Sequence, residues 1–330
     1  MKTVDIVVPC FNEAEVVETF LAETERICGQ IAGYRFSYIF VDDGSRDATL
    51  PLLRKMQQEN ERVHYLSFSR NFGKEAAMYA GLKHTSGDYV IVMDADLQHP
   101  PALIPQMVKE LEAGHDCAAA CRSTRDGEKG LRSLFSSLFY RFSNSMSDVK
   151  MPQNAVDFRM MTRQMVDAIL SLSEVERFSK GIFVWVGFDT VWIPYENVER
   201  TLGTSKWSFK GLLKYAIDGI TAFTVKPLKL IRNFGILLCG ISLIYILATL
   251  IKTLIMGIDV PGYASLLCIT LFLGGTIQLS IGVVGEYVAH IYLEAKDRPV
   301  YILKETDLAA LPEGAKDAAS GEDAKEAPRA

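Results

Sequence analysis

The sequence predicts an α/β protein in which a mostly parallel sheet is followed by a two-helix transmembrane hairpin. Short runs rich in valine and isoleucine alternate with helical segments through residue 121, as in sheets covered by helices on both faces. Two uncharged apolar runs then follow at residues 234–251 and 262–285. A membrane span needs roughly 20 mostly apolar residues, so two such runs in tandem are typical of a hairpin.

The elements of the sheet domain can be placed in order along the chain. The apolar runs predict strands at residues 4–8, 36–41, 63–68, 89–93 and 116–121. Helices are predicted between them at residues 12–31, 47–59 and 74–84 and after Pro100-Pro101, where proline suits a first turn. Asn12 and Glu15 have the spacing of a capping box, which predicts that the first helix starts there.

Carboxylates follow two of the predicted strands, as Asp42-Asp43 and as Asp94-Ala95-Asp96. Residues i and i+2 of an extended segment point the same way, so Asp94 and Asp96 would repel each other unless a cation lay between them. Mg²⁺ and Mn²⁺ take oxygen ligands and share them with phosphate-bearing substrates. The triplet thus indicates a metal–diphosphate site, although two solvated turn carboxylates would give the same short pattern. Ligands of such sheets bind beyond the carboxyl ends of the strands, where both groups fall.

Several other classes of site are disfavoured. The chain has a net charge of −5, so no overall basic field favours nucleic acid. No glycine-rich dinucleotide fingerprint follows the first strand, and no Walker phosphate loop is present. The five histidines lack metal-ligand spacing, and the six cysteines form no Cys-x-x-Cys pair, which fits a reducing compartment.

Basic residues lie at both ends of the hairpin: Lys226, Lys229 and Arg232 before it and Lys296, Arg298 and Lys304 after it. Because positive residues favour the cytoplasmic side, the large N-terminal domain and both termini are predicted to be cytoplasmic, in a multi-pass protein of the inner membrane. Residues 130–147 and 209–223 have the pattern of amphipathic helices, which fits either core packing or the membrane surface. The tail has a composition typical of disorder.

The predicted domains follow from these boundaries. They are a cytoplasmic sheet domain at 1–207, amphipathic juxtamembrane helices at 208–232, spans at 233–256 and 263–286, a cytoplasmic segment at 287–305 and a disordered tail at 306–330.

Four ordered motifs carry a resemblance to a known family. They lie at residues 9–13 (PCFNE), 41–45 (VDDGS), 69–75 (SRNFGKE) and 94–98 (DADLQ), with later matches at 200–206 and 283–287. Over about residues 3–304 the chain resembles family 2 glycosyltransferases with a GT-A fold, and within them polyprenyl-phosphate glycosyltransferases. It is most similar to the bactoprenol (undecaprenyl-phosphate) glucosyltransferases, which are related to dolichyl-phosphate mannose synthases.

The resemblance implies a role for each matching position. The residues that would bind the nucleotide sugar are Pro9, Asn12, Glu13, Asp42, Lys74, Asp94, Arg200 and Lys206. The residues that would hold a Mg²⁺ or Mn²⁺ cofactor are Asp94, Asp96 and Gln98, and those that would meet the lipid phosphate are Arg122 and Arg132. Asp157, Arg200 and Asp96 would be catalytic, with the role of Asp157 open between base and positioning group.

The implied activity is transfer of a hexose, with inversion, from a nucleotide sugar to polyprenyl phosphate at the cytoplasmic leaflet. UDP-glucose is the first choice of donor, and UDP-N-acetylglucosamine and GDP-mannose are alternatives. A processive polysaccharide synthase is disfavoured because the chain has one hairpin and no Gln-x-x-Arg-Trp motif. An inactive nucleotide-sugar sensor is the remaining alternative, although it would be expected to lose the metal ligands. The resemblance also implies a homo-oligomer, namely a tetramer.

Overall fold

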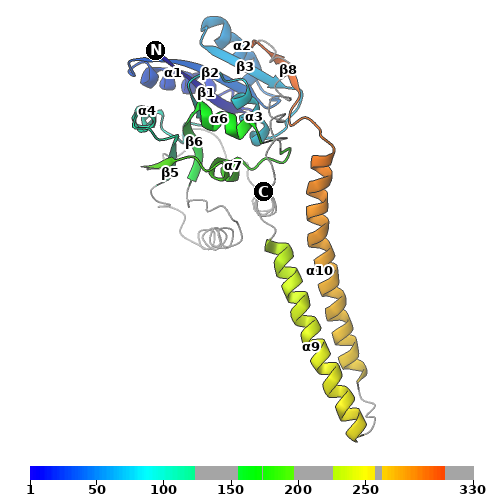
Figure 1. The fold of residues 1–330 in the computed structure, drawn as a ribbon. Helices are drawn as coiled ribbons and strands as arrows, with labels where there is room; N and C mark the ends of the chain where they lie inside the picture. Colours follow the sequence, from blue (N-terminus) through cyan, green and yellow to red (C-terminus); the bar gives the residue numbers. More distant parts are fainter. Residues whose placement is uncertain (123–154, 173, 197–225, 257–261, 309–330) are drawn as a thin grey trace, which may run out of the picture. The chain divides into compact units, whose positions relative to one another are not determined.

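The computed structural model describes residues 1–122, 155–172, 174–196, 226–256 and 262–308 (Figure 1). The chain divides into two compact units. One unit comprises Met1–Ser133, Met151–Lys206 and Pro299–Ala330 and contains the sheet, and the other comprises Leu134–Lys150 and Trp207–Arg298 and contains two long helices.

Eight strands of the first unit form one sheet in the order β7-β5-β6-β4-β1-β2-β3-β8. Their bounds are β1 Lys2–Cys10, β2 Tyr34–Asp42, β3 Val63–Phe68, β4 Tyr89–Val92, β5 Cys117–Arg122, β6 Ala155–Thr162, β7 Thr190–Tyr195 and β8 Leu303–Thr306. The four strands β4-β1-β2-β3 are parallel, as are β5 and β7. β6 is antiparallel to both β4 and β5, and β8 is antiparallel to β3, so the sheet is mixed.

Helices cover both faces of this sheet. Their bounds are α1 Val17–Cys28, α2 Thr49–Glu59, α3 Lys74–Lys83, α4 Ile104–Glu112, α6 Arg163–Leu170 and α7 Ser179–Trp185, with a short 3-10 turn at Pro101–Leu103. One core cluster joins α1, α2 and α4 to the alternate β1 residues Val4, Ile6 and Val8. α3 packs on the opposite face, where a Cβ on Gly81 would lie 2.2 Å from Val7 Cγ1. This close approach requires glycine and fixes the height of α3 over the sheet.

The five strands predicted from apolar runs are confirmed, but the predicted start of the first helix was wrong. The first helix begins at Val17 rather than after Asn12, because Asn12 has a left-handed φ of 54° and bonds to the loop after β2 instead of capping a helix. β6 was not foreseen, and its two antiparallel pairings make the sheet mixed, while most strand pairs remain parallel as expected.

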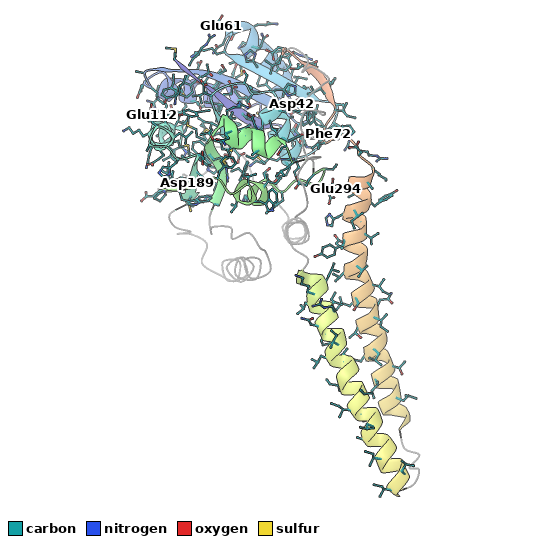
Figure 2. All side chains as sticks on the ribbon, viewed as in Figure 1. Asp42, Glu61, Phe72, Glu112, Asp189 and Glu294 are labelled. Carbon is teal, nitrogen blue, oxygen red and sulfur yellow. The ribbon has the colours of Figure 1, made fainter. Side chains whose placement is uncertain are left out.

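The second unit contains α9 Lys226–Met256 and α10 Tyr263–Ala295, which contact each other. Both are long and apolar enough to cross a membrane, with candidate windows at Leu228–Tyr245 and Phe272–Ala295. Many large apolar side chains of the two helices are exposed, as Figure 2 shows. α10 continues beyond the predicted end of the second span at residue 286. The predicted amphipathic helices at 130–147 and 209–223 lie outside the described residues.

The chain returns to the sheet of the first unit after α10. β8 pairs with β3 along one edge, and Tyr301 stacks on Phe68 with ring centroids 5.1 Å apart. Beyond β8, the Asp307 carboxylate accepts a hydrogen bond from the Tyr65 backbone N–H at 2.7 Å. Thr306 and Asp307 therefore belong to the sheet domain, although the sequence placed the start of a disordered tail at residue 306. Residues 309–330 lie outside the described residues.

Candidate functional site

The candidate site lies at the carboxyl edge of the central parallel strands. β2 and β4 both pair with β1 in parallel, with Cys10 opposite Asp42 and Val7 opposite Val92. The segments that follow β2 and β4 therefore start at the same edge of the sheet. This places Asp42-Asp43 and Asp94-Ala95-Asp96 on one edge, as the sequence predicted.

Asp42 is buried and hydrogen-bonded to neighbouring residues. Its side chain is only 1% exposed. One carboxylate oxygen accepts a hydrogen bond from the Ser45 N–H at 3.0 Å, and the other accepts one from Ser67 Oγ at 2.8 Å. Gly44 has a φ of +67°, and a Cβ there would lie 2.4 Å from the Arg70 backbone carbon, so the turn requires glycine. Protein donors thus hold both oxygens of this carboxylate, and its assignment to the nucleotide stays a prediction.

Asn12 connects the end of β1 to this turn. Its backbone N–H donates to Ser45 Oγ at 2.9 Å, and its side-chain oxygen accepts from the Arg46 N–H at 2.8 Å. The loops after β1 and β2 are thus joined at two points. Pro9 and Glu13, the other predicted nucleotide-binding residues of this segment, are half-buried beside it.

Asp43 holds the loop that leads into α3. Its two carboxylate oxygens accept hydrogen bonds from the Phe72 N–H at 2.6 Å and the Gly73 N–H at 2.9 Å. Figure 2 labels Phe72 in the same part of the first unit as Asp42. Burial raises the pKa of Asp43, and the two N–H groups oppose this shift. Since Gly73 directly precedes α3, Asp43 fixes the position of Lys74, the first residue of that helix.

Lys74 joins two of the predicted site carboxylates. Its Nζ lies 2.7 Å from Asp94 Oδ1 and 2.7 Å from Asp157 Oδ2. Asp157 lies on β6, the strand that pairs with β4, which explains why the two carboxylates meet. The carboxylates after β4 were expected to need a nearby cation, and Lys74 is one such cation for Asp94.

The charges of this cluster are strongly coupled. Burial disfavours charge on all three groups, but the ion pairs outweigh it. The pKa of Lys74 is raised by Asp157 and Asp94, while Lys74 lowers the pKa of Asp94 with help from His99. The pKa of Asp157 is also lowered, by Lys74 and then by Lys180. The two carboxylates are therefore ionised at neutral pH, which makes Asp157 a weak base.

The turn after β4 presents Asp96 and Gln98. Leu97 between them has a left-handed φ of 55°, and the Gln98 N–H donates to Asp96 Oδ1 at 3.1 Å. No group of three or more His, Cys, Asp or Glu side chains within the described ranges could hold a metal ion. Mg²⁺, however, is commonly bound by one or two carboxylates together with substrate phosphates and water. The donor set around Asp96 fits a metal shared in this way.

Sequence reasoning missed two side chains of this edge, His99 and Tyr195. His99 Nδ1 lies 2.7 Å from Tyr195 Oη, and its Nε2 lies 3.7 Å from Asp94 Oδ2. Tyr195 Oη also accepts a hydrogen bond from Arg122 Nε at 3.3 Å. The contact arises because Arg122 and Tyr195 are register partners at the ends of β5 and β7. His99 directly follows the 94–98 motif, which is the one signal that could have indicated it.

The environment of Asp157 is set by its neighbours on β6 and α7. Arg159 is buried, stacks over the Phe183 ring at 3.9 Å and donates to the backbone oxygens of Val156 and Asp157. Glu75, next to Lys74, accepts hydrogen bonds from the backbone and side chain of Ser179 at the start of α7. These contacts fix the strand end that carries Asp157.

Three predicted site residues have no described position. Arg132, Arg200 and Lys206 lie outside the described residues, so their assignments to the lipid phosphate and the diphosphate stay predictions. Pro9, Asp42 and Arg122 lie at the ends of β1, β2 and β5, and Asp157 lies near the start of β6. The others follow β1 or β4 or begin α3: Asn12, Glu13, Asp94, Asp96, Gln98 and Lys74.

Comparison with known proteins assigns a family to this arrangement. The profile described as Glycosyl transferase family 2 matches residues 5–170, which run from β1 through α6. Together with the described strands and the two long apolar helices, this match confirms the expected fold class, a GT-A-like α/β sheet followed by two apolar helices.

Curated relatives are similar over nearly the whole chain. The chain is 46% identical over 305 residues to the "Putative glycosyltransferase CsbB" of Bacillus subtilis, covering 92% of each protein. It is 41% identical over 303 residues to the "SfII prophage-derived bactoprenol glucosyl transferase" of Shigella flexneri, covering 92% of this chain and 98% of that protein. Among solved structures, glucosyl-3-phosphoglycerate synthase from Mycobacterium tuberculosis aligns with a TM-score of 0.44 at 18% identity, over 67% of this chain and 78% of that chain.

Proposed function

The chain belongs to glycosyl transferase family 2, and from this membership we propose that it transfers glucose from UDP-glucose to undecaprenyl phosphate with inversion. The proposal for donor and acceptor is supported by relatives named bactoprenol glucosyl transferase, which are 39–41% identical over 91–92% of this chain. The two apolar helices support it as well, since a polyprenyl acceptor resides in a membrane.

The observation that carries the proposal is the arrangement of charge at the carboxyl edge. Asp94, Asp96 and Asp157 lie there with Lys74, which pairs with two of them. A donor diphosphate entering among these carboxylates would be repelled unless a further cation came with it. We therefore propose that Asp96 binds Mg²⁺ or Mn²⁺ together with the donor diphosphate, with Gln98 beside it. Such a metal would stabilise negative charge on the leaving diphosphate.

In the proposed reaction a phosphate oxygen of the acceptor attacks the anomeric carbon of the sugar. A new carbon–oxygen bond forms on one face while the bond to the diphosphate breaks on the other, and UDP leaves with the electron pair. The second pKa of a phosphate monoester is about 6, so the acceptor is largely a dianion at neutral pH and needs no strong base. This agrees with the lowered pKa of Asp157.

Asp157 is accordingly assigned a positioning and electrostatic role. Its carboxylate is held by Lys74, and its backbone oxygen accepts from Arg159, so the group would stabilise positive charge that develops on the sugar ring. Arg122, at the end of β5, would bind the acceptor phosphate, because a guanidinium fork matches phosphate oxygens.

The test uses the full-length protein in detergent with undecaprenyl phosphate, MgCl₂ or MnCl₂, and a panel of UDP-glucose, UDP-N-acetylglucosamine and GDP-mannose. Mass spectrometry of the lipid fraction is expected to show undecaprenyl-phosphate hexose from UDP-glucose, and none when EDTA is present. If another donor gives the product, the sugar of that donor would replace glucose in the proposed reaction. No glycosylated lipid from any donor would overturn the enzyme proposal in favour of an inactive sensor.

A further inference from the structure

Three side chains link the carboxylates after β4 to the end of β5. From Asp94 the chain of contacts runs to His99, then to Tyr195, then to Arg122, with separations of 3.7, 2.7 and 3.3 Å. The first distance is a contact between the imidazole and the carboxylate that is longer than a hydrogen bond, and the other two are hydrogen bonds. This series of contacts thus joins the proposed donor side of the site to the proposed acceptor side.

The two central members are packed as firmly as core residues. His99 is 4% exposed and Tyr195 is 5% exposed. The imidazole ring stacks on Phe158 with centroids 6.0 Å apart and meets the Tyr195 ring edge to face at 5.8 Å. Because the rings are confined on two sides, the imidazole cannot turn without disturbing the packing.

The two outer residues of this contact series, Asp94 and Arg122, distinguish it from an ordinary buried polar contact. His84, for comparison, places its Nδ1 against the Ala80 backbone oxygen at 2.8 Å, a contact within the end of its own helix. His99 instead contacts the distant Tyr195 on β7 as well as the charged Asp94 of its own segment, and Tyr195 also contacts the charged Arg122 on β5. The pair therefore connects a residue proposed for the donor side, Asp94, with one proposed for the acceptor side, Arg122.

The direction of the bond between Arg122 and Tyr195 follows from the chemistry of the groups, and the proposal assigns that of the bond between Tyr195 and His99. The Arg122 guanidinium can only donate, so Tyr195 Oη accepts from it. The phenolic proton can then be donated to His99 Nδ1, which leaves the imidazole proton on Nε2, facing Asp94. This tautomer is assigned from the network rather than observed.

We propose that His99 and Tyr195 are positioning residues that hold the Arg122 guanidinium at a fixed place relative to Asp94. The inference rests on the proposed function, in which Arg122 binds the acceptor phosphate. Holding a guanidinium through Nε fixes the plane in which its two Nη groups can donate to a phosphate. Attack on the sugar requires the reacting atoms to approach to roughly 3–3.5 Å, and a misplacement of about 1 Å can cost up to a hundredfold in rate.

The first experiment compares Tyr195→Phe with the wild type in the lipid-transfer assay. Tyr195→Phe removes only the hydroxyl and keeps the ring packing. The KM for undecaprenyl phosphate is expected to rise about tenfold, equivalent to ~1.4 kcal/mol, while the KM for UDP-glucose stays within about twofold. His99→Asn, which keeps a polar group near the Nδ1 position, is expected to be less impaired than His99→Leu. The matched control is Tyr38→Phe, a fully buried tyrosine on β2 outside the site, which is expected to leave both KM values unchanged.

A double-mutant cycle tests whether the effect passes through Arg122. In an Arg122→Ala background, Tyr195→Phe is expected to add less than about twofold to the acceptor KM, because the group that it positions is gone. Full additivity would overturn the proposal, as would a Tyr195→Phe enzyme with unchanged acceptor KM and kcat. These outcomes differ from failure of the proposed function, in which the wild type itself makes no glycosylated lipid. In that case the positioning role is also disproved, because it depends on the proposed function.

A second measurement applies if Tyr195→Phe does not fold. The chain has five histidines, so ¹⁵N-histidine NMR of the full-length protein can be assigned with one His99→Asn sample. The proposal expects His99 to carry its proton on Nε2 with Nδ1 as acceptor. A neutral His99 with its proton on Nδ1 would overturn the proposed network.

Discussion

Lys74 Nζ lies 2.7 Å from Asp157 Oδ2, although the two residues are separated by 83 positions in sequence. The ion pair joins the start of α3 to β6, and the same ammonium group contacts Asp94 after β4. Asp43 supports the arrangement by holding the loop before α3 through two backbone N–H groups. One lysine thus balances two carboxylates at the edge where the donor is proposed to bind.

Lys74→Met is expected to lower kcat/KM for lipid glycosylation by about a hundredfold or more, since a preorganised charge is lost. Without Lys74 the pKa values of Asp94 and Asp157 rise toward those set by burial. In the wild type the pKa values of Asp94 and Asp157 are lower in the folded state than in the unfolded state. Their contribution to stability is therefore present at pH values above the unfolded-state pKa and is lost as the pH falls through the folded-state pKa. Because the pH dependence of kcat/KM reports the pKa values of essential groups in the free enzyme, its acid limb is expected to move to higher pH in the variant.

The matched control for this prediction is Lys55→Met. Lys55, on α2, forms an exposed ion pair with Glu18 on α1 at 3.3 Å. Exposed pairs contribute about 0–1 kcal/mol, so activity and pH profile are expected to match the wild type. An unshifted acid limb in Lys74→Met would show that the lysine does not control the ionisation of these carboxylates.

Asp96→Asn tests the proposed metal site. The Asn side-chain oxygen can still accept the hydrogen bond from the Gln98 N–H, so the turn should be preserved. Activity is expected to fall on the order of a thousandfold, because a metal contributes several kcal/mol of charge stabilisation. Mn²⁺ binding in the presence of UDP, followed by electron paramagnetic resonance, should be lost as well. Asp167→Asn, at a largely exposed site on α6, is the control and should retain both. Normal Mn²⁺ binding by Asp96→Asn would remove this residue from the metal site.

Asp43→Asn is expected to weaken the loop before Lys74. Asparagine has one acceptor oxygen, so its NH₂ group would face one of the two N–H donors of Phe72 and Gly73. A buried unsatisfied donor costs about 1–3 kcal/mol of unfolding free energy, which a thermal melt in detergent can measure. The control is Asp88→Asn, because a single Asp88 oxygen accepts both hydrogen bonds from Thr3. Equal melting temperatures for the two variants would contradict the proposed loop anchor.

Residues of the site could be predicted from the sequence where a local pattern marks them. They could not be predicted where their role depends on contact with a segment that is distant in sequence. The strand that leads to Asp94 and Asp96 was predicted at residues 89–93 because that run is apolar, and β4 occupies Tyr89–Val92. Asn12 misled the helix assignment because its partners, Ser45 and Arg46, lie on another loop.

For other residues and elements, the local sequence does not indicate where they lie in the fold. β8 is only four residues long and contains Lys304 and Glu305, so its pairing with β3 depends on the return of the chain after α10. His99 was one of five histidines without ligand spacing, and its relation to Tyr195 depends on the β5–β7 register. Lys74 was assigned to the site by resemblance, but its pairing with Asp157 required the position of β6.

Truncation can separate the sheet-bound part of the C-terminal segment from the residues beyond Leu308. A chain that ends after Leu308 keeps β8, the Arg54–Glu305 ion pair and the hydrogen bond between Asp307 and Tyr65, so its activity and melting temperature should equal those of the wild type. A chain that ends after Ile302 exposes the edge of β3 and should aggregate or melt at lower temperature. Equal stability of the two truncated proteins would show that β8 contributes nothing to the fold.

The return of β8 to the sheet also predicts membrane topology. β3 and β8 belong to one unit, and the segment between them includes α9 and α10. If both helices span the membrane, the chain must cross it twice and come back to the side of the sheet, because strands cannot pair across a bilayer. The basic residues at both ends of the hairpin favour the cytoplasm for that side.

A membrane-impermeant maleimide added to intact cells can test this topology. A cysteine introduced at Asp259, between the two helices, is expected to be labelled from outside. One introduced at Glu61, whose side chain is 89% exposed on the sheet unit, is expected to be labelled only after the cells are lysed. The unmodified chain provides the background from the native cysteines. Labelling of the Glu61 position in intact cells would place the sheet unit outside, where cytoplasmic UDP-glucose could not reach it, and would contradict both the topology and the proposed donor.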